Sequence, residues 1–149
     1  MTEAAATDAT RLEPPVGDVS VPFWEATKER RYVVQWCAAC DEPIYYPREV
    51  CPRCLSADTL DWRTSRGTGT VYAVSVQHRP ANPLMADRVP YAVALVDLAD
   101  GVRVMSNVVN CDPESVRVGD AVRVAWEPLS DGRNLPVFEP QPAFEAKES

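Results

Sequence analysis

A chain of 149 residues and 16.5 kDa has room for one ordinary domain, or for a small domain joined to a metal-stapled module. Its formal net charge of -7, from 15 basic and 22 acidic residues, argues against a surface built to bind nucleic-acid phosphates. The N-terminus has no secretory signal, and no apolar run reaches the length of a membrane span. We therefore expect a cytoplasmic protein that does not enter a membrane.

Both ends of the chain are poor in core-forming residues. Residues 1–19 are rich in Ala, Thr, Asp, Glu and Pro, and residues 141–149 are similar, so we expect two flexible tails. A helix is predicted over residues 20–31, with Ser20 as its N-cap and Pro22 in its first turn. Its aromatic pair, Phe23 and Trp24, either belongs to the core or anchors a partner protein, because aromatic residues dominate interface hot spots.

The segment WCAACDEPIYYPREVCPRCLS, residues 36–56, holds four of the five cysteines in two C-x-x-C pairs. Each pair can turn two sulfur atoms to one side of a tight knuckle, and two knuckles supply the four thiolates of a tetrahedral zinc site. A thioredoxin-type redox motif needs only one such pair, and a disulfide framework belongs to oxidising compartments. We therefore predict one structural Zn²⁺ bound by Cys37, Cys40, Cys51 and Cys54.

Two β-rich segments frame this metal motif. YVVQW precedes the first knuckle and TLDWR follows the second, so we expect a zinc ribbon over residues 32–63. A metal held by four protein thiolates has no open position for water or substrate. The ribbon is therefore expected to hold the chain in shape rather than to catalyse a reaction.

Residues 64–140 predict five strands without a helix between them, and hence a small barrel of the OB type. The segments are GTGTVYAVSVQH, YAVALVDL, VRVMSNVV, DAVRVAWEP and LPVFEP. In the first, Tyr72, Val74 and Val76 are expected on one face, and an Asp100-Gly101 turn joins the second to the third. The whole chain is thus expected to be mainly β, with one N-terminal helix, a zinc ribbon and a five-stranded barrel.

Five segments follow one another along the chain: FWEATKERRYVVQWCAAC, YPREVCPRC, DWRTSRGTGTVYAVSV, VRVGDAVRVAWEP and VFEP. With these segments in this order, the chain resembles an acyl-CoA-associated family with a rubredoxin-like zinc ribbon and an OB-fold. The resemblance implies an accessory subunit that docks on a thiolase-like enzyme in a hetero-oligomer and helps to form its acyl-CoA site. A retro-aldolase of steroid side-chain degradation is the specific partner it suggests. Glycine often follows each knuckle in such ribbons, whereas Asp41 and Leu55 stand there in this chain.

The residues themselves offer little for catalysis. His78 is the only histidine, and Cys111 is the only cysteine outside the ribbon, with no histidine near it in the sequence. Such single residues are more often structural than catalytic, so an independent acyl-CoA enzyme would lack a nucleophile and a base. A module for single-stranded nucleic acid is the alternative, because many OB barrels have that function. The acidic balance of the chain, with lysine only at positions 28 and 147, argues against it.

The loop RPANPLMADRVP, residues 79–90, joins the first two barrel strands and is stiffened by three prolines. It is either a solvated connector or a clamp in which apolar residues meet a partner or the pantetheine arm while an arginine meets a CoA phosphate. The candidate residues for CoA or partner contacts in this loop are Arg79, Asn82, Leu84, Met85 and Arg88.

Overall fold

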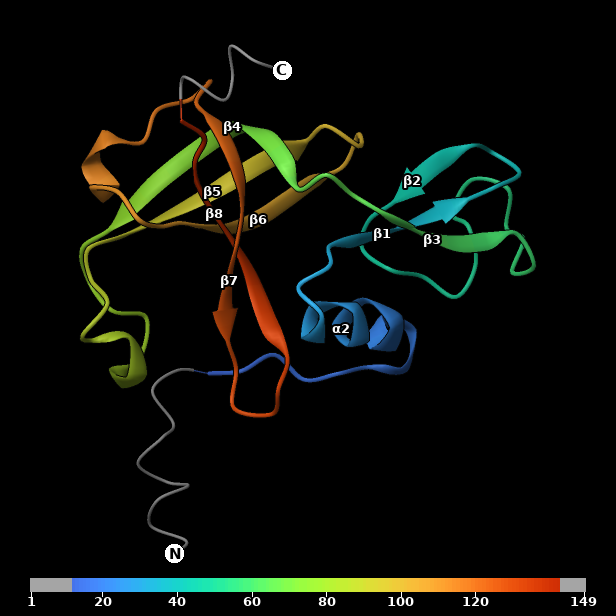
Figure 1. The fold of residues 1–149 in the computed structure, drawn as a ribbon, viewed down its shortest axis with the longest axis horizontal. Coiled ribbons are helices and arrows are strands. Elements are labelled where there is room, and N and C mark those ends of the chain that lie inside the picture. Colours follow the sequence, from blue (N-terminus) through green and yellow to red (C-terminus); the bar gives the residue numbers. More distant parts are fainter. Residues whose placement is uncertain (1–11, 143–149) are drawn as a thin grey trace, which may run out of the picture.

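The computed structural model describes residues 12–142, so the outer parts of the two expected tails, 1–11 and 143–149, lie outside the described residues. One helix and a three-stranded sheet lie at one end of a closed five-stranded barrel (Figure 1). The expected fold class is confirmed: the chain is mainly β, with an N-terminal helix, a four-cysteine ribbon and an OB-type barrel.

The helix α2, Val21–Lys28, follows a short 3₁₀ turn, η1, Asp18–Ser20. Ser20 occupies the N-cap as expected, but its hydroxyl bonds the backbone of Gly17 rather than the helix. The helix ends before residue 31 because Arg30 adopts a left-handed conformation with φ 56°. Its N–H bonds the carbonyl of Thr27 at 2.9 Å and that of Arg31 bonds Ala26 at 3.0 Å, which is a Schellman ending.

The ribbon contains an antiparallel sheet of three strands. The central strand β1, Val33–Cys37, pairs with β2, Glu42–Ile44, on one side and with β3, Leu60–Thr64, on the other. The two cysteine knuckles lie in the turns at the same end of this sheet, because Cys37 ends β1 opposite Leu60 at the start of β3. The sheet thereby sets the position of the first knuckle relative to the second.

The barrel has the strand order β4-β5-β6-β8-β7, and pairing of β4 with β7 closes it. Two short 3₁₀ turns, η2, Pro83–Met85, and η3, Pro113–Ser115, lie in its connections. Strands β6 and β8 run parallel and pair at a single position, Val108 with Phe138. The strands are β4, Thr68–Gln77; β5, Tyr91–Leu98; β6, Arg103–Val108; β7, Ala121–Pro128; and β8, Asn134–Pro140.

One prediction about the barrel faces is wrong. Tyr72 was expected on the same face as Val74, but Val71 is the buried residue and Tyr72 is 49% exposed. The reason is a register shift between Val71 and Ala73 in the pairing of β4 with β5, which reverses the alternation of the strand.

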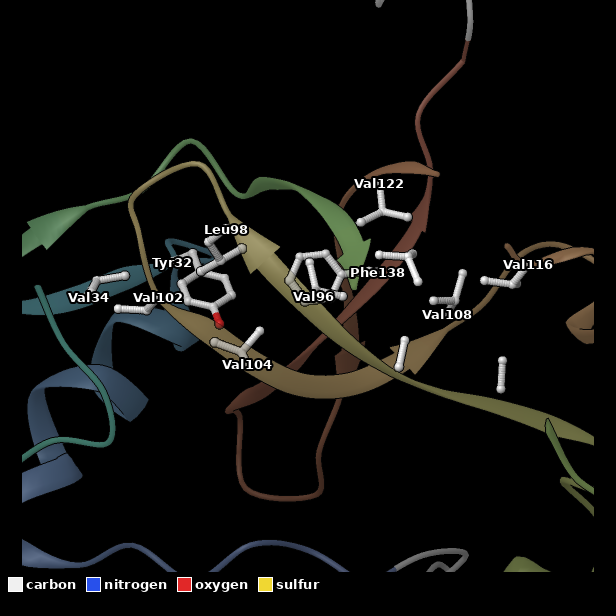
Figure 2. Packing of buried hydrophobic residues seen from close by; sticks show 13 residues of the cluster. Tyr32, Val34, Val96, Leu98, Val102, Val104, Val108, Val116, Val122 and Phe138 are labelled. Carbon is white, nitrogen blue, oxygen red and sulfur yellow. The ribbon is translucent and has the colours of Figure 1, made fainter. Parts of the chain in front are cut away.

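The core of the barrel consists mainly of valine side chains around Phe138, which is fully buried (Figure 2). Tyr32, from the segment between α2 and β1, inserts its ring into the same core, with ring centroids 6.2 Å from Trp126 and 6.4 Å from Phe138. Burial raises the pKa of Tyr32, so its phenol stays protonated. This one side chain therefore joins the helix-ribbon unit to the barrel.

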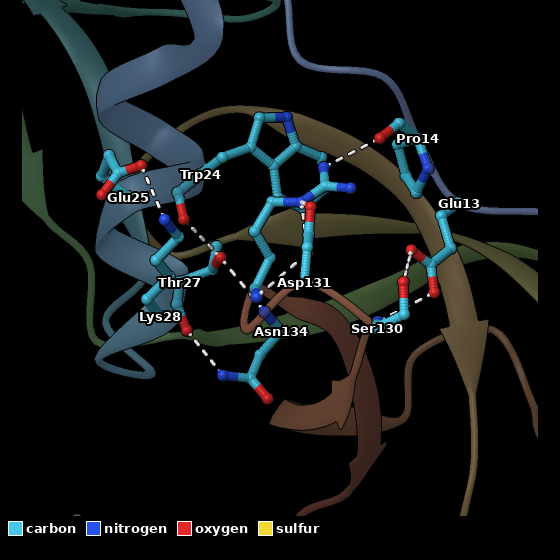
Figure 3. Close-up of polar contacts among 10 residues, drawn as sticks. Glu13, Pro14, Trp24, Glu25, Thr27, Lys28, Ser130, Asp131 and Asn134 are labelled. Atoms are coloured by element: carbon cyan, nitrogen blue, oxygen red, sulfur yellow. Dashed lines mark hydrogen bonds and ion pairs between the residues drawn. The ribbon is translucent and has the colours of Figure 1, made fainter. Parts of the chain in front are cut away.

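The helix is also tied to the hairpin between β7 and β8 (Figure 3). The side-chain amide of Asn134 donates a 2.8 Å hydrogen bond to the carbonyl of Thr27. The carboxylate of Glu13 accepts hydrogen bonds from the backbone and the hydroxyl of Ser130, at 2.9 and 2.8 Å. The described part of the expected N-terminal tail, residues 12–19, is thus held along the hairpin.

Candidate metal centre and loop pocket

The four ribbon cysteines form one cluster, in which all sulfur atoms lie within 4.8 Å of one another. Sγ of Cys37 is 3.7 Å from that of Cys54, and Sγ of Cys40 is 3.9 Å from that of Cys51. Tetrahedral coordination with Zn–S bonds of about 2.3 Å places sulfur atoms about 3.8 Å apart. The cluster therefore has the dimensions of a four-thiolate metal site.

Both knuckles have the same backbone geometry. The N–H of Asp41 bonds the carbonyl of Cys37 at 2.7 Å, and the N–H of Leu55 bonds the carbonyl of Cys51 at 2.8 Å. Asp41 has φ 56° and Leu55 has φ 64°, the left-handed region that favours glycine. Asp41 and Leu55, which stand where glycine was expected, thus adopt the conformation that glycine favours, and both knuckles are complete.

Hydrogen bonds favour the thiolate form of two of the four cysteines, Cys37 and Cys51. The Thr59 hydroxyl, 3.3 Å from Sγ of Cys37, lowers the pKa of that thiol to about 6. Backbone N–H groups lower the pKa of Cys51 in the same way. Burial raises the pKa of Cys40 to about 12, an effect that a bound dication would oppose. The donor set therefore fits a soft, divalent cation, with four protein ligands and no open position.

The loop over residues 79–90 borders a hollow of about 480 Å³ at the barrel surface, which we call the loop pocket. Met85 and Arg88 line it from the loop, and Tyr91, Asn107 and Cys111 are among its residues from the barrel side. Two of the five loop candidates are therefore brought together at one concave site.

The other loop candidates lie elsewhere. Asn82 caps the short η2 turn, because its Oδ1 accepts a 2.9 Å hydrogen bond from the N–H of Leu84. Leu84 is 37% exposed, and Arg79 is exposed at the start of the loop. These three residues shape or border the loop without lining the pocket.

Phe23 and Trp24 lie far along the chain from the loop and pack against the centre of the molecule. Their rings meet edge to face at 5.0 Å, and Phe23 also contacts Tyr32 at 5.8 Å. Trp24 is only 9% exposed, and the guanidinium of Arg133 covers its ring at 4.7 Å. This placement favours the core alternative for Trp24, whereas half-buried Phe23 borders open space.

The two single candidates for catalysis, His78 and Cys111, lie in different surroundings. Nε2 of exposed His78 lies 3.0 Å from a carboxylate oxygen of Glu114. Cys111 is half-buried in the loop pocket, where burial raises the pKa of its thiol, the opposite of what a nucleophilic cysteine requires. Among the helices within residues 12–142, none is long and apolar enough to cross a membrane.

Sequence reasoning did not find the residues that complete the loop pocket. Tyr91 and Asn107 belong to strands that read as ordinary barrel strands, and Leu135 lies in the last strand. They meet because β6 and β8 become neighbours when the barrel closes. The sequence signal that could have indicated this pocket is Asn107, a polar residue near the end of a barrel strand.

The fold and the cysteine cluster define a zinc-ribbon protein with an OB-fold domain. Residues 24–60 match the family model "ChsH2, rubredoxin-like zinc ribbon domain", and residues 62–127 match "ChsH2, C-terminal OB-fold domain". The solved structure "Ltp2-ChsH2(DUF35) aldolase" contains a chain that is 38% identical, with a TM-score of 0.77 over 86% of this chain and 98% of that one. The protein belongs to this ChsH2 (DUF35) family.

The curated relatives include a probable enoyl-CoA hydratase alpha subunit of Thermomonospora curvata, 39% identical over 89% of this chain. A 3-oxo-4,17-pregnadiene-20-carboxyl-CoA hydratase alpha subunit of Mycobacterium tuberculosis is 30% identical over 79% of this chain. The chain spans only 40% and 36% of the lengths of these two proteins. A DUF35 domain-containing scaffold protein of Methanothermobacter thermautotrophicus is 33% identical over 64% of this chain and 71% of its own length.

Proposed function

We propose that this chain is a non-catalytic accessory subunit that docks on a thiolase-like catalytic subunit and helps to form its acyl-CoA site. The observation that carries the proposal is the 38% identity to a chain of the Ltp2-ChsH2(DUF35) aldolase, which is matched over 98% of its length. The scaffold proteins among the relatives support the same kind of role.

The chemistry of the described residues agrees with this division of labour. Among residues 12–142, Nε2 of His78 pairs with Glu114 at the surface, and burial raises the pKa of the Cys111 thiol, which disfavours a nucleophilic thiolate. A subunit of this kind contributes by orienting a substrate and completing a site whose nucleophile and base lie on another chain. The metal of the ribbon is Zn²⁺ in this proposal, and it stabilises the ribbon without taking part in the reaction.

The loop pocket is the part of the shared site that this chain supplies. Arg88 and Met85 both line it from the loop. A guanidinium suits the phosphates of CoA, and apolar surface suits the pantetheine arm. Arg79, exposed at the entrance of the loop, is available for a second phosphate or for the partner.

The particular partner we propose is an aldolase that acts on steroid side-chain acyl-CoA esters. Similarity to two proteins supports this choice: the aldolase in the matched structure, and the pregnadiene-carboxyl-CoA hydratase alpha subunit among the relatives. Both concern proteins that this chain resembles over most of its own length. A thiolase is the alternative partner of the same class.

The barrel offers poor support for binding single-stranded nucleic acid. Stacking platforms for bases require exposed aromatic faces. The exposed ring of Tyr72 is instead covered by the guanidinium of Arg103 at 3.3 Å, and Arg103 is bonded to Asp97 at 2.6 Å. One face of this ring is therefore covered, and the cation is already paired with a carboxylate.

The proposal is tested by purifying the tagged chain from its source cells under mild conditions and identifying what comes with it by mass spectrometry. We expect a thiolase-fold protein in a fixed stoichiometry that survives size exclusion. A Cys51→Ser variant, which disrupts the ribbon, serves as the control for background binding. Recovery of the chain with nucleic acid, or as a lone species from cells that contain the thiolase-fold protein, would contradict the proposal.

A further inference from the structure

The four cysteines of the metal cluster differ in their exposure to solvent. Cys37 and Cys51 are fully buried, Cys40 is half-buried, and Cys54 is exposed. Residues 52–55 of the second knuckle are all exposed, so solvent reaches the cluster from this side. A small molecule that approaches the ribbon therefore meets the sulfur of Cys54 before the other three.

The two buried sulfur atoms accept hydrogen bonds from the ribbon. Sγ of Cys37 lies 3.3 Å from the hydroxyl of Thr59 and 3.4 Å from the N–H of Cys40. Sγ of Cys51 accepts a hydrogen bond of 3.4 Å from the N–H of Arg53. Each of these donors holds part of the negative charge of a thiolate and lowers its tendency to attack an electrophile.

The other two sulfur atoms differ from each other as well. The side chain of Arg53 bonds the sulfur of Cys40 and also donates a 3.2 Å hydrogen bond to the carbonyl of Pro43. Among residues 12–142, no N–H or hydroxyl group donates a hydrogen bond to Sγ of Cys54, whose close neighbour is Sγ of Cys37 at 3.7 Å. Cys54 therefore combines the greatest exposure in the cluster with the least compensation of its charge.

We propose that Cys54 is the site at which peroxides and soft electrophiles modify this protein, and that Cys37 resolves the oxidised sulfur. The inference stands independently of the proposed function. With hydrogen peroxide, the thiolate of Cys54 attacks one oxygen, the O–O bond breaks, and the products are a sulfenic acid and hydroxide. The thiolate of Cys37 then attacks Sγ of Cys54, and a second hydroxide leaves as the disulfide forms. The two sulfur atoms together lose two electrons, which reduce the peroxide.

This reaction removes half of the ligands of the site. Cys40 and Cys51 remain, and two thiolates do not complete the tetrahedral coordination of a structural Zn²⁺. Oxidation therefore converts the ribbon from a metal-bound to a metal-free form, and a thiol reductant with added zinc restores it. Alkylation of Cys54 has the same effect on the metal but is not reversed by a reductant.

The first test is limited alkylation of the zinc-loaded full chain with iodoacetamide. The Cys111→Ser variant serves as the parent, so that every thiol belongs to the ribbon. Peptide mapping by mass spectrometry should find Cys54 modified about tenfold faster than any other cysteine, with zinc release to a chromogenic chelator at the same rate. Equal rates at all four cysteines, or first modification at Cys40, would overturn the inference.

The second test treats the same parent with hydrogen peroxide. The first disulfide should join Cys37 to Cys54, and a first disulfide between any other pair would overturn the assignment of Cys37. Cys54→His keeps four ligands, because histidine also binds zinc, and should slow peroxide-driven zinc release about tenfold. Cys40→His is the matched control and should release zinc as fast as the parent, because it retains Cys54. Equal protection by the two histidine variants would contradict the inference. If either variant fails to bind zinc, the order of modification in the parent decides.

Discussion

The guanidinium of Arg133 lies over the indole ring of Trp24 at 4.7 Å, and this contact fastens helix α2 to the β7–β8 hairpin. The same guanidinium bonds the carboxylate of Asp131 at 2.8 Å and the carbonyl of Pro14 at 2.8 Å. Arg133 is only 6% exposed, so its charge depends on these partners for compensation. The side chain of Arg133 therefore connects the N-terminal segment at Pro14, the helix at Trp24 and the β7–β8 hairpin.

Replacement of Arg133 should consequently destabilise the whole chain. We expect Arg133→Met to lower the free energy of unfolding by about 2 kcal/mol, because it keeps most of the packing but removes the charge-assisted hydrogen bonds. Arg66→Met, at an exposed arginine, should change it by less than about 0.5 kcal/mol. Urea unfolding of both variants measures the difference. An equal effect of the two substitutions would show that Arg133 does not hold the helix.

Metal content tests the ribbon. Elemental analysis of the purified chain should give one Zn²⁺ per molecule, bound by the four clustered cysteines. Cys51→Ser should release the metal and unfold the ribbon, since a structural site contributes on the order of 10 kcal/mol to folding. Cys111→Ser, outside the cluster, should retain the metal. A fully folded chain without metal would refute the site.

The second knuckle predicts an unusual stabilising substitution. Leu55 has φ 64° and is 72% exposed, so it bears the strain of a left-handed residue without burying its side chain. Leu55→Gly should raise the free energy of unfolding by about 0.5–1 kcal/mol. The substitution relieves the backbone strain, and this gain exceeds the loss that comes from the greater freedom of glycine in the unfolded chain. Leu55→Ala should give no such gain. Chemical unfolding at a fixed free zinc concentration compares the three chains, and a destabilised glycine variant would show that the side chain of Leu55 has another role.

Much of the fold follows from local patterns in the sequence. The spacing of the cysteines predicts the metal cluster, and the alternating segments predict all five barrel strands, because both signals depend on residues close together in the chain. The end of the helix was missed because Arg30 occupies a position where glycine is the usual signal. Tyr72 was placed on the wrong face because a register shift depends on the neighbouring strand.

The candidate site was less predictable. The loop drew attention through its prolines and arginines, yet nothing in that segment distinguishes Arg88, which lines the pocket, from Arg79, which does not. The hollow between helix, ribbon and barrel is lined by residues that are far apart in sequence, such as Phe23, Tyr46 and Val104.

The two arginines should therefore differ in kinetics of the assembled enzyme. We expect Arg88→Ala to raise the KM for the acyl-CoA about tenfold with little change in kcat, because a phosphate contact supplies binding common to the ground and transition states. Arg79→Ala should have a smaller effect on the same constant. Size exclusion should show both variants still in the complex. A fall in kcat with unchanged KM for Arg88→Ala would place this residue in the chemistry instead.

The accessory role is tested most directly by steady-state kinetics of the thiolase-like partner with and without this chain. This chain alone should be inert toward acyl-CoA esters, and the partner alone should be weakly active or insoluble. Mixing or co-expression should restore turnover and give one peak that contains both chains on size exclusion. Full activity of the partner without this chain, or turnover by this chain alone, would contradict the proposed function.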